Sequence, residues 1–134
     1  MIRNAAFHHV SAAGLAGVIK VMRPQLQDEG EFRIRFLREA KVAIQLRHPN
    51  IAQLYDFAID DDGAGGYMVL EFVDGRNLQD LIAEKRIRSL SLKVRIARQA
   101  LEALGFLHRR GFVHRDVSPD NLMITLDHDG EPLV

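Results

Sequence analysis

Apolar and polar positions along the first third of the chain predict a strand followed by a helix. Residues 17–22 form an apolar run interrupted by a single lysine, which is typical of a strand. After the acidic pair at 28–29, apolar side chains recur at helical spacing, namely Phe32, Phe36, Ala40, Ala43 and Ile44. Because the residue before a proline disfavours helix, we expect this helix to end before Pro49.

Two further strands joined by a turn are expected next. The first is indicated by residues that share one parity, namely Gln53, Tyr55, Phe57 and Ile59. Residues 60–66 are rich in Asp and Gly and favour a turn, after which residues 67–72 form the returning strand. Asp74-Gly75 then interrupts the pattern, and we take it as the boundary between two lobes.

Beyond this boundary the pattern becomes helical. Asn77 can cap a short helix, and Ser89 or Ser91 can cap a longer one, because their side-chain oxygens accept from free backbone amides. The apolar face of the longer helix is expected to comprise Ile96, Ala97, Ala100, Leu101, Leu104 and Leu107.

The last part of the chain predicts a hairpin. Gly111 fits the left-handed position just past the long helix. Residues 122–125 predict a strand, Asp129-Gly130 a tight turn, and residues 133–134 the beginning of the partner strand. A hairpin that stops in its second strand predicts an incomplete domain with an unpaired edge.

Composition narrows the functional classes. A chain of 134 residues with 47% hydrophobic and 27% charged residues allows one ordinary globular domain. Its 18 basic and 18 acidic residues cancel, which argues against a nucleic-acid binder, and the absence of Cys excludes disulfides and thiol catalysis. No apolar run approaches the length of a membrane span, and the N-terminus lacks the pattern of a signal peptide, so we expect a cytoplasmic domain.

The segment His114-Arg115-Asp116-Val117-Ser118-Pro119-Asp120-Asn121 carries the candidate chemistry. It resembles the catalytic loop of protein kinases, in which an Asp is followed five residues later by an Asn. Phosphoryl transfer needs a carboxylate that orients the attacking hydroxyl and an oxygen ligand that holds magnesium against the phosphates. The resemblance implies that Asp116 is the catalytic base and Asn121 the metal ligand.

The resemblance extends upstream in the order that the family requires. Lys20, in Val18-Ile19-Lys20, is similar to the third-strand lysine that grips the nucleotide phosphates, and Glu39 to the helix glutamate that pairs with it. The segment His48-Pro49-Asn50-Ile51 resembles the link to the fourth strand. The chain is thus identified as similar to the eukaryotic-like, Hanks-type serine/threonine kinases of bacteria.

Residues 67–75 resemble the fifth strand and hinge of the same family. The resemblance implies that Leu70 lies beside the adenine of ATP as the gatekeeper. It also implies that the Glu71 carbonyl and the Val73 amide hydrogen-bond the adenine edge. Val18 would lie over the adenine, where the family usually has a smaller Ala.

Other features depart from the family pattern. Ser118 occupies a position where many serine/threonine kinases carry a lysine near the transferred phosphate. Gly14 and Gly17 do not reproduce the glycine-rich loop, and no Asp-Phe-Gly motif occurs in the sequence. We therefore expect a truncated α+β kinase fold with a partial N-lobe at 1–73 and the hinge and start of the C-lobe at 74–134.

The implied function is ATP- and Mg²⁺-dependent phosphoryl transfer to Ser/Thr hydroxyls of a protein substrate by the complete domain, with the present chain inactive alone. One alternative is a non-catalytic, pseudokinase-like binding module that docks on a partner such as the complementary kinase segment. Another is a small-molecule kinase of the aminoglycoside type, which the His-Arg-Asp and His-Pro-Asn motifs disfavour. The six His residues show no ligand spacing, so a zinc site is not expected.

Overall fold

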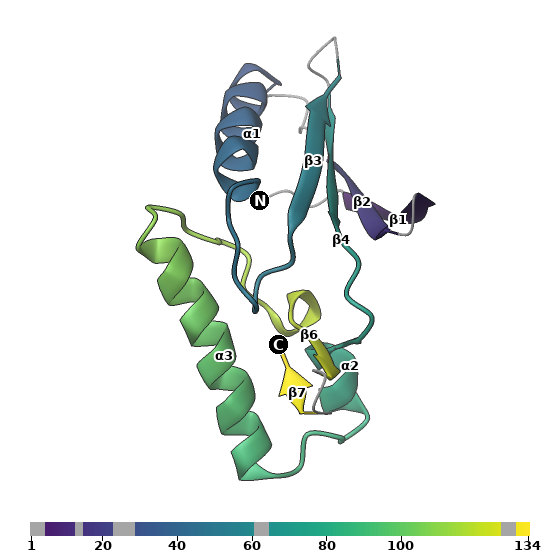
Figure 1. Ribbon diagram of the computed structural model, residues 1–134, viewed down its shortest axis with the longest axis vertical. Coiled ribbons are helices and arrows are strands. Elements are labelled where there is room, and N and C mark those ends of the chain that lie inside the picture. The colour runs from purple at the N-terminus through teal and green to yellow at the C-terminus, as the bar shows by residue number, and fades with distance from the viewer. Residues whose placement is uncertain (1–4, 13–14, 23–28, 61–64, 127–130) are drawn as a thin grey trace. The chain divides into compact units, whose positions relative to one another are not determined.

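The computed structural model describes residues 5–12, 15–22, 29–60, 65–126 and 131–134 (Figure 1). It divides into two compact units, each with its own sheet. The unit that we call the sheet unit comprises residues 1–47 and 52–72. The other, the helical unit, comprises residues 48–51 and 73–134.

The sheet unit contains a four-stranded antiparallel sheet and one helix. Its elements are β1 (Ala5–Ala12), β2 (Leu15–Met22), α1 (Glu29–Ala43), β3 (Leu54–Ile59) and β4 (Gly66–Glu71). The strands lie in the order β1-β2-β4-β3. The strand expected at 17–22, the helix and the following hairpin are therefore present, whereas β1 was not predicted. The tip of that hairpin, residues 61–64, lies outside the described residues.

The core of the sheet unit forms where α1 covers one face of the sheet (Figure 1). Phe36 and Ala40 of α1 and Leu54 of β3 are buried at its centre. The side chains packed around them are Leu37, Ala43, Ile44, Phe57, Ile59, Met68 and Leu70. Phe36 and Phe57 meet edge to face with ring centroids 6.3 Å apart, an arrangement that aromatic pairs favour. The predicted helical spacing thus places Phe36 and Ala40 correctly, while the side chain of Phe32 is not described.

The strand predicted from the parity of residues 53–59 is present as β3, but burial does not follow one parity along it. Leu54 is only 3% exposed, whereas Tyr55 is 40% exposed. Leu54 pairs with Leu70 and Asp56 with Val69, so the strand contains a register shift at this point. One extra residue in a strand exchanges its two faces. Strict alternation therefore predicts the outer half of β3, with Phe57 and Ile59 against the core, but not its beginning.

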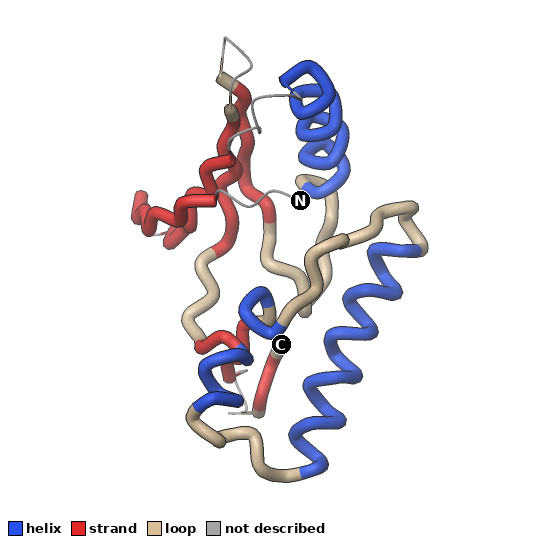
Figure 2. Tube along the Cα trace, turned by 180° about the vertical axis from the view of Figure 1, so that it is seen from behind, coloured by secondary structure: helices blue, strands red, loops and turns tan. Residues whose placement is uncertain are grey.

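The helical unit combines three short strands with two helices (Figure 2). Its elements are β5 (Arg76–Asn77), α2 (Leu78–Ala83), α3 (Leu90–His108), the 3₁₀ turn η1 (Pro119–Asn121), β6 (Met123–Leu126) and β7 (Pro132–Leu133). The strand order is β5-β6-β7, with both pairs antiparallel. The strand expected at 122–125 and its partner are both found, whereas Asp129-Gly130 lies outside the described residues.

The helix ends follow the capping residues of the sequence. The Asn77 side chain accepts a hydrogen bond from the Asp80 amide at 2.7 Å, and the Ser89 hydroxyl accepts from the Leu92 amide at 3.2 Å. Ser89 rather than Ser91 is therefore the cap of α3. Gly111 has a φ of +71°, the left-handed geometry that closes a helix at low cost for glycine.

The buried face of α3 differs from the expected one. Its buried residues are Ile96, Gln99, Ala103 and Leu107. Ala97 and Leu101 are exposed, Leu101 by 66%, although both were expected to face the core. The buried side of α3 is thus shifted from the apolar pattern and includes a polar residue, Gln99, while Ile96 and Leu107 are buried as expected.

Gln99 is buried with its side-chain amide hydrogen-bonded. Its Nε2 donates to the Pro132 carbonyl at 3.0 Å, and its Oε1 accepts from the Val134 amide at 2.9 Å. Asn50 Nδ2 donates to both Gln99 Oε1 and the Val134 carbonyl, each at 2.8 Å. Since a buried amide is costly unless hydrogen-bonded, this network fixes α3, β7 and residues 48–51 to one another.

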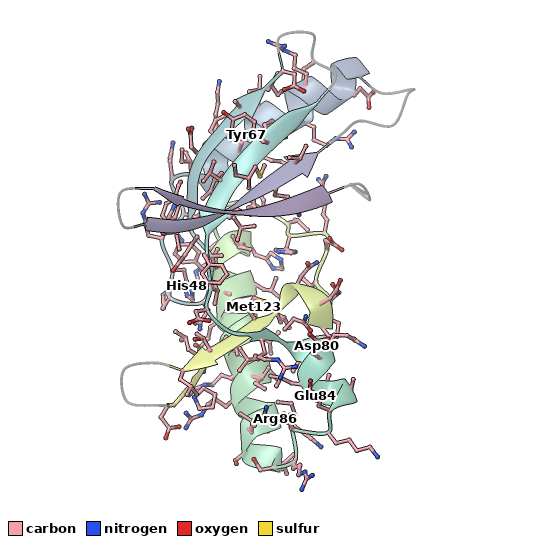
Figure 3. All side chains as sticks on the ribbon, turned by 90° about the vertical axis from the view of Figure 1, so that its right-hand side faces the viewer. His48, Tyr67, Asp80, Glu84, Arg86 and Met123 are labelled. Atoms are coloured by element: carbon pink, nitrogen blue, oxygen red, sulfur yellow. The ribbon has the colours of Figure 1, made fainter. Side chains whose placement is uncertain are left out.

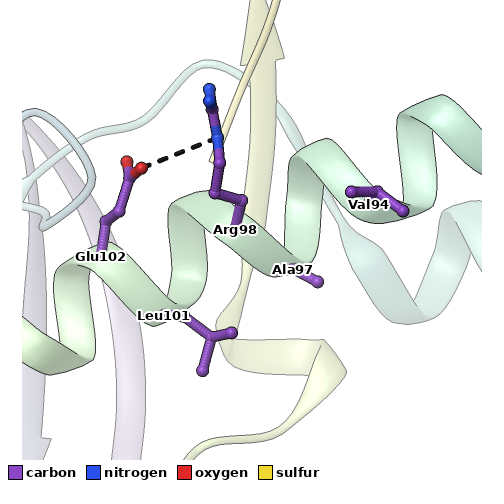
Figure 4. A pocket seen from close by; sticks show the side chains of 5 residues that line it. All are labelled: Val94, Ala97, Arg98, Leu101 and Glu102. Atoms are coloured by element: carbon purple, nitrogen blue, oxygen red, sulfur yellow. Dashed lines mark ion pairs between the residues drawn. The ribbon is translucent and has the colours of Figure 1, made fainter.

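The opposite face of α3 is apolar and exposed. Leu90, Val94 and Leu101 are between 58% and 75% exposed. Val94, Ala97 and Leu101 line a shallow hollow of about 440 Å³ beside an ion pair between Arg98 and Glu102 (Figure 4). No helix among the described residues is long and apolar enough to cross a membrane.

Candidate functional site

The loop between α3 and β6 is organised by the side chain of Asn121. Its Nδ2 donates to the Asp116 carbonyl at 2.9 Å and to the Ser118 hydroxyl at 3.1 Å. The Asn121 amide also donates to the Ser118 carbonyl at 3.0 Å, which closes the turn η1. Pro119 begins that turn, where its fixed φ is compatible with a helical first position. The structure therefore brings the two catalytic-loop residues of the sequence analysis, Asp116 and Asn121, into direct contact.

Asp116 is held through its backbone while its side chain is exposed. Its amide donates to Nδ1 of His114 at 3.3 Å. Arg115, between them, has a φ of +64°, an uncommon conformation for a residue with a side chain. Such backbone strain is concentrated at functional sites, where the surrounding structure maintains it. The exposed carboxylate of Asp116 is chemically able to accept a proton from a hydroxyl.

The same loop contains an acidic group with a shifted pKa. A side-chain hydrogen bond with Ser118, supported by a hydrogen bond to its own backbone, holds the pKa of the Asp120 carboxyl below its ordinary value. Asp120 therefore remains ionised to a lower pH than a free carboxyl would. Ser118 thus interacts with both of the side chains at the end of the loop.

The strand register places Lys20 on the side of the sheet that α1 covers. Lys20 is opposite Met68, and Val18 is opposite Leu70. Directly opposed residues of antiparallel strands share one face, and Met68 and Leu70 pack against the core below α1. Lys20 is therefore on the same side as Glu39 of α1, and both side chains are half-buried. The ion pair between them stays a prediction.

The segment predicted to bind adenine lies at the end of β4. The Glu71 amide donates to the Gln53 carbonyl at 2.7 Å, and the Glu71 carboxylate accepts from the Gln53 amide at 3.0 Å. Val73 is half-buried and follows at the beginning of the second part of the helical unit. Glu71 is thus anchored at a strand end, while the proposed adenine contacts of Leu70, Glu71 and Val73 stay predictions.

Sequence reasoning did not identify the partners of residues 48–51. The ring of His48, which is labelled in Figure 3, lies 4.8 Å from the ring of Phe106. The Arg110 guanidinium lies over the same Phe106 ring at 3.6 Å. Asn50 bonds to Gln99, 49 positions away. Two amide side chains so far apart in sequence give no local pattern. The only signal for this contact was Gln99 itself, a polar residue at an inward position of α3.

The described residues contain no group of three His, Cys, Asp or Glu side chains arranged to hold a metal ion. Mg²⁺ is commonly bound through one or two protein oxygens together with substrate phosphates and water.

Comparison with known families matches residues 7–132 to the protein kinase domain. Serine/threonine-protein kinase PknB of Mycobacterium leprae is 38% identical over 109 residues, covering 80% of this chain and 18% of PknB. A probable serine/threonine-protein kinase of Streptomyces coelicolor is 37% identical over 123 residues, covering 87% of this chain and 18% of that protein.

A solved structure extends the similarity to the fold. The crystal structure of a mutant PknI kinase domain of Mycobacterium tuberculosis matches with a TM-score of 0.71 at 30% sequence identity. The match covers 96% of this chain and 52% of that domain. The chain thus spans about half the length of the solved kinase domain and less than a fifth of the curated relatives.

Proposed function

Because the chain belongs to the protein kinase domain family, we propose that it supplies the phosphate-gripping lysine, the hinge and the catalytic loop of a bacterial serine/threonine protein kinase. The observation that carries the proposal is the hydrogen bond from Asn121 to the Asp116 carbonyl. It holds a candidate base and a candidate metal ligand on one short loop, as phosphoryl transfer requires. The complete domain would transfer the γ-phosphate of ATP to a Ser or Thr hydroxyl of a protein.

Each catalytic residue has a defined part in this proposal. The Asp116 carboxylate orients the attacking hydroxyl and takes its proton. Lys20 neutralises charge on the nucleotide phosphates, and Glu39 fixes the direction of Lys20 through an ion pair. Their common side of the sheet supports the pairing.

The proposed cofactors are ATP and Mg²⁺. The adenine would contact Val18 and Leu70, which are cross-strand partners, and the backbone of Glu71 and Val73. Asn121 fits Mg²⁺ as a contributing ligand, since both of its side-chain hydrogen bonds use Nδ2 and its Oδ1 is the atom suited to a hard cation. Bound Mg²⁺ would supply electrostatic stabilisation of the transferring phosphoryl group. Such chemistry would take place in the cytoplasm, where ATP is abundant.

We further propose that the sheet unit corresponds to the partial N-lobe at 1–73 and that the helical unit corresponds to the beginning of the C-lobe at 74–134. The helical unit also includes residues 48–51, so the lobes would not follow a single cut in the sequence. Since the sequence has no Asp-Phe-Gly motif, we expect the 134 residues alone to transfer phosphate slowly or not at all.

The test is ATP binding by calorimetry with and without Mg²⁺, on the wild type, Lys20→Ala and the control Lys41→Ala. Lys41 is an exposed lysine in the last turn of α1. The proposal expects Mg²⁺-dependent binding that Lys20→Ala weakens at least tenfold and Lys41→Ala leaves unchanged. Equal binding by all three proteins, or no binding by the wild type, would contradict it.

The exposed face of α3 favours a second candidate, a binding module that docks on a complementary kinase segment. Besides the hollow in Figure 4, a cavity of about 750 Å³ opens between α2 and α3. Its apolar lining residues are Leu78, Ile82, Ile87, Ile96, Ala97, Ala100 and Leu122. Apolar patches on this scale commonly mark interaction surfaces. Light scattering tests this candidate, because a strictly monomeric, monodisperse chain would count against it.

A further inference from the structure

Ser118 contacts several residues of the candidate catalytic loop. Its hydroxyl accepts a hydrogen bond from Asn121 Nδ2 at 3.1 Å and also interacts with the Asp120 carboxylate. Its carbonyl accepts from the Asn121 amide at 3.0 Å. The side chain is half-buried in a loop whose neighbouring residues are exposed. Ser118 therefore interacts with two consecutive residues, Asp120 and Asn121.

The hydrogen bond between Asn121 Nδ2 and the Ser118 hydroxyl affects how the Asn121 amide is oriented. The two N–H groups of Asn121 Nδ2 point in different directions, one toward the Asp116 carbonyl and one toward the Ser118 hydroxyl. The χ2 torsion of Asn is otherwise broad and nearly two-fold, so one hydrogen bond alone leaves the amide plane poorly defined. Two hydrogen bonds fix the plane and with it the direction of Oδ1.

We propose that Ser118 is a positioning residue that orients the Asn121 amide, so that Oδ1 is presented to a divalent cation. The inference rests on the proposed function for the identity of the cation, because Asn121 is the candidate Mg²⁺ ligand. Ser118, which occupies the position where the resemblance expects a lysine, then has a different role. A neutral hydroxyl there acts on the metal ligand instead of placing a positive charge beside the phosphate.

The first experiment measures the Asn121 side-chain amide directly and needs no ligand. We would compare its ¹⁵N–¹H₂ resonances and hydrogen-exchange rate in the wild type, Ser118→Ala, Ser118→Thr and Ser91→Ala. Ser91 is a matched control, because its hydroxyl is bonded to Ser89 at the beginning of α3, away from the catalytic loop. The proposal expects shifted resonances and exchange at least threefold faster in Ser118→Ala alone. Unchanged Asn121 signals in Ser118→Ala would overturn it.

The second experiment measures the metal dependence. Residues that orient a metal ligand typically contribute tenfold or more to metal affinity. We therefore expect Ser118→Ala to need at least about tenfold more Mg²⁺ to reach half-maximal ATP binding by calorimetry, while Ser118→Thr stays within about threefold of the wild type. Equal Mg²⁺ requirements in all variants would overturn the positioning role. If the wild type shows no Mg²⁺-dependent binding, the proposed function fails, and the inference fails with it as a statement about a metal ligand.

Discussion

The two charged residues of the sheet unit illustrate what one side chain contributes to the candidate site. Lys20 reaches the side of the sheet that α1 covers because its cross-strand partner is Met68, a core residue. Glu39 reaches the same side because it precedes Ala40, the most deeply buried residue of α1. Neither position depends on the charge itself. The apolar neighbours determine both positions, so conservative changes in the core are expected to move both side chains.

One charge pair in the helical unit gives a prediction about pH. The Arg76 guanidinium, bonded to the carboxylate at the end of α2, lowers the pKa of Glu84 below its ordinary value (Figure 3). A lowered pKa in the folded state contributes stability at pH values above the unfolded pKa, and this contribution is lost as the pH falls through the folded pKa. We expect Arg76→Gln to raise the Glu84 pKa toward its ordinary value in a carbon-13 carboxyl titration.

The control for this titration is Arg86→Gln. Arg86 also lowers the Glu84 pKa, but through a weaker, longer-range attraction. Its substitution should therefore shift the titration less than Arg76→Gln does. Equal shifts in the two variants would show that the direct hydrogen bond is not the main cause.

At the scale of the elements, the backbone of Gly75 lies close to the backbone of β6. A side-chain Cβ at Gly75 would lie 2.5 Å from the Ile124 carbonyl oxygen, which no flexible side chain can relieve. We expect Gly75→Ala to lower the free energy of unfolding by about 1–3 kcal/mol, the usual cost of overpacking. Urea unfolding followed by circular dichroism measures this change.

Gly30 of α1 provides the matched control, because no atom of the described residues lies within 4 Å of the place that an alanine Cβ would take there. Alanine is the better helix former, so Gly30→Ala should leave stability unchanged or raise it by up to about 1 kcal/mol. A loss of stability in Gly30→Ala equal to that in Gly75→Ala would contradict the steric explanation.

The contact between α3 and β7 depends on the buried amide of Gln99. Replacing it by Leu keeps the volume but leaves the Val134 amide and the Pro132 carbonyl without this partner. We expect Gln99→Leu to cost about 1–3 kcal/mol in urea unfolding, because buried polar groups would be left unsatisfied. The exposed Gln79 of α2 is the control, and Gln79→Leu should change stability by less than about 0.5 kcal/mol.

Local signals in the sequence account for most of the elements and for the candidate catalytic loop at residues 114–121. The caps at Asn77 and Ser89, the helical spacing of Phe36 and Ala40, and the turn at Gly111 act within a few residues, so they are readable without the fold. The burial of Leu54 at the beginning of β3 was not predicted, and the predicted face of α3 was partly wrong, because a register shift and a distant amide partner determine them. Short strands such as β5 exist only through pairing, which no local pattern records.

At the scale of the entire chain, the exposed apolar face of α3 is the main surface to explain. We expect Val94→Glu to reduce the binding of an apolar fluorescent dye at least twofold, because it places a charge in the apolar lining of the hollow. Glu102→Gln at the edge of the same hollow is the control and should not reduce dye binding. Equal dye fluorescence in Val94→Glu and the wild type would show that this face is not the accessible apolar surface.

The bond between Asn50 and the Val134 carbonyl has a consequence for the order of folding. It joins positions 84 residues apart, and closing so long a loop is entropically costly until other structure forms. During synthesis the hydrogen-bond network of Gln99, Asn50 and Val134 cannot be completed before residue 134 leaves the ribosome. Until then Asn50 and Gln99 lack the Val134 backbone as a hydrogen-bond partner, so we expect this network to be incomplete in a nascent chain that has not reached residue 134.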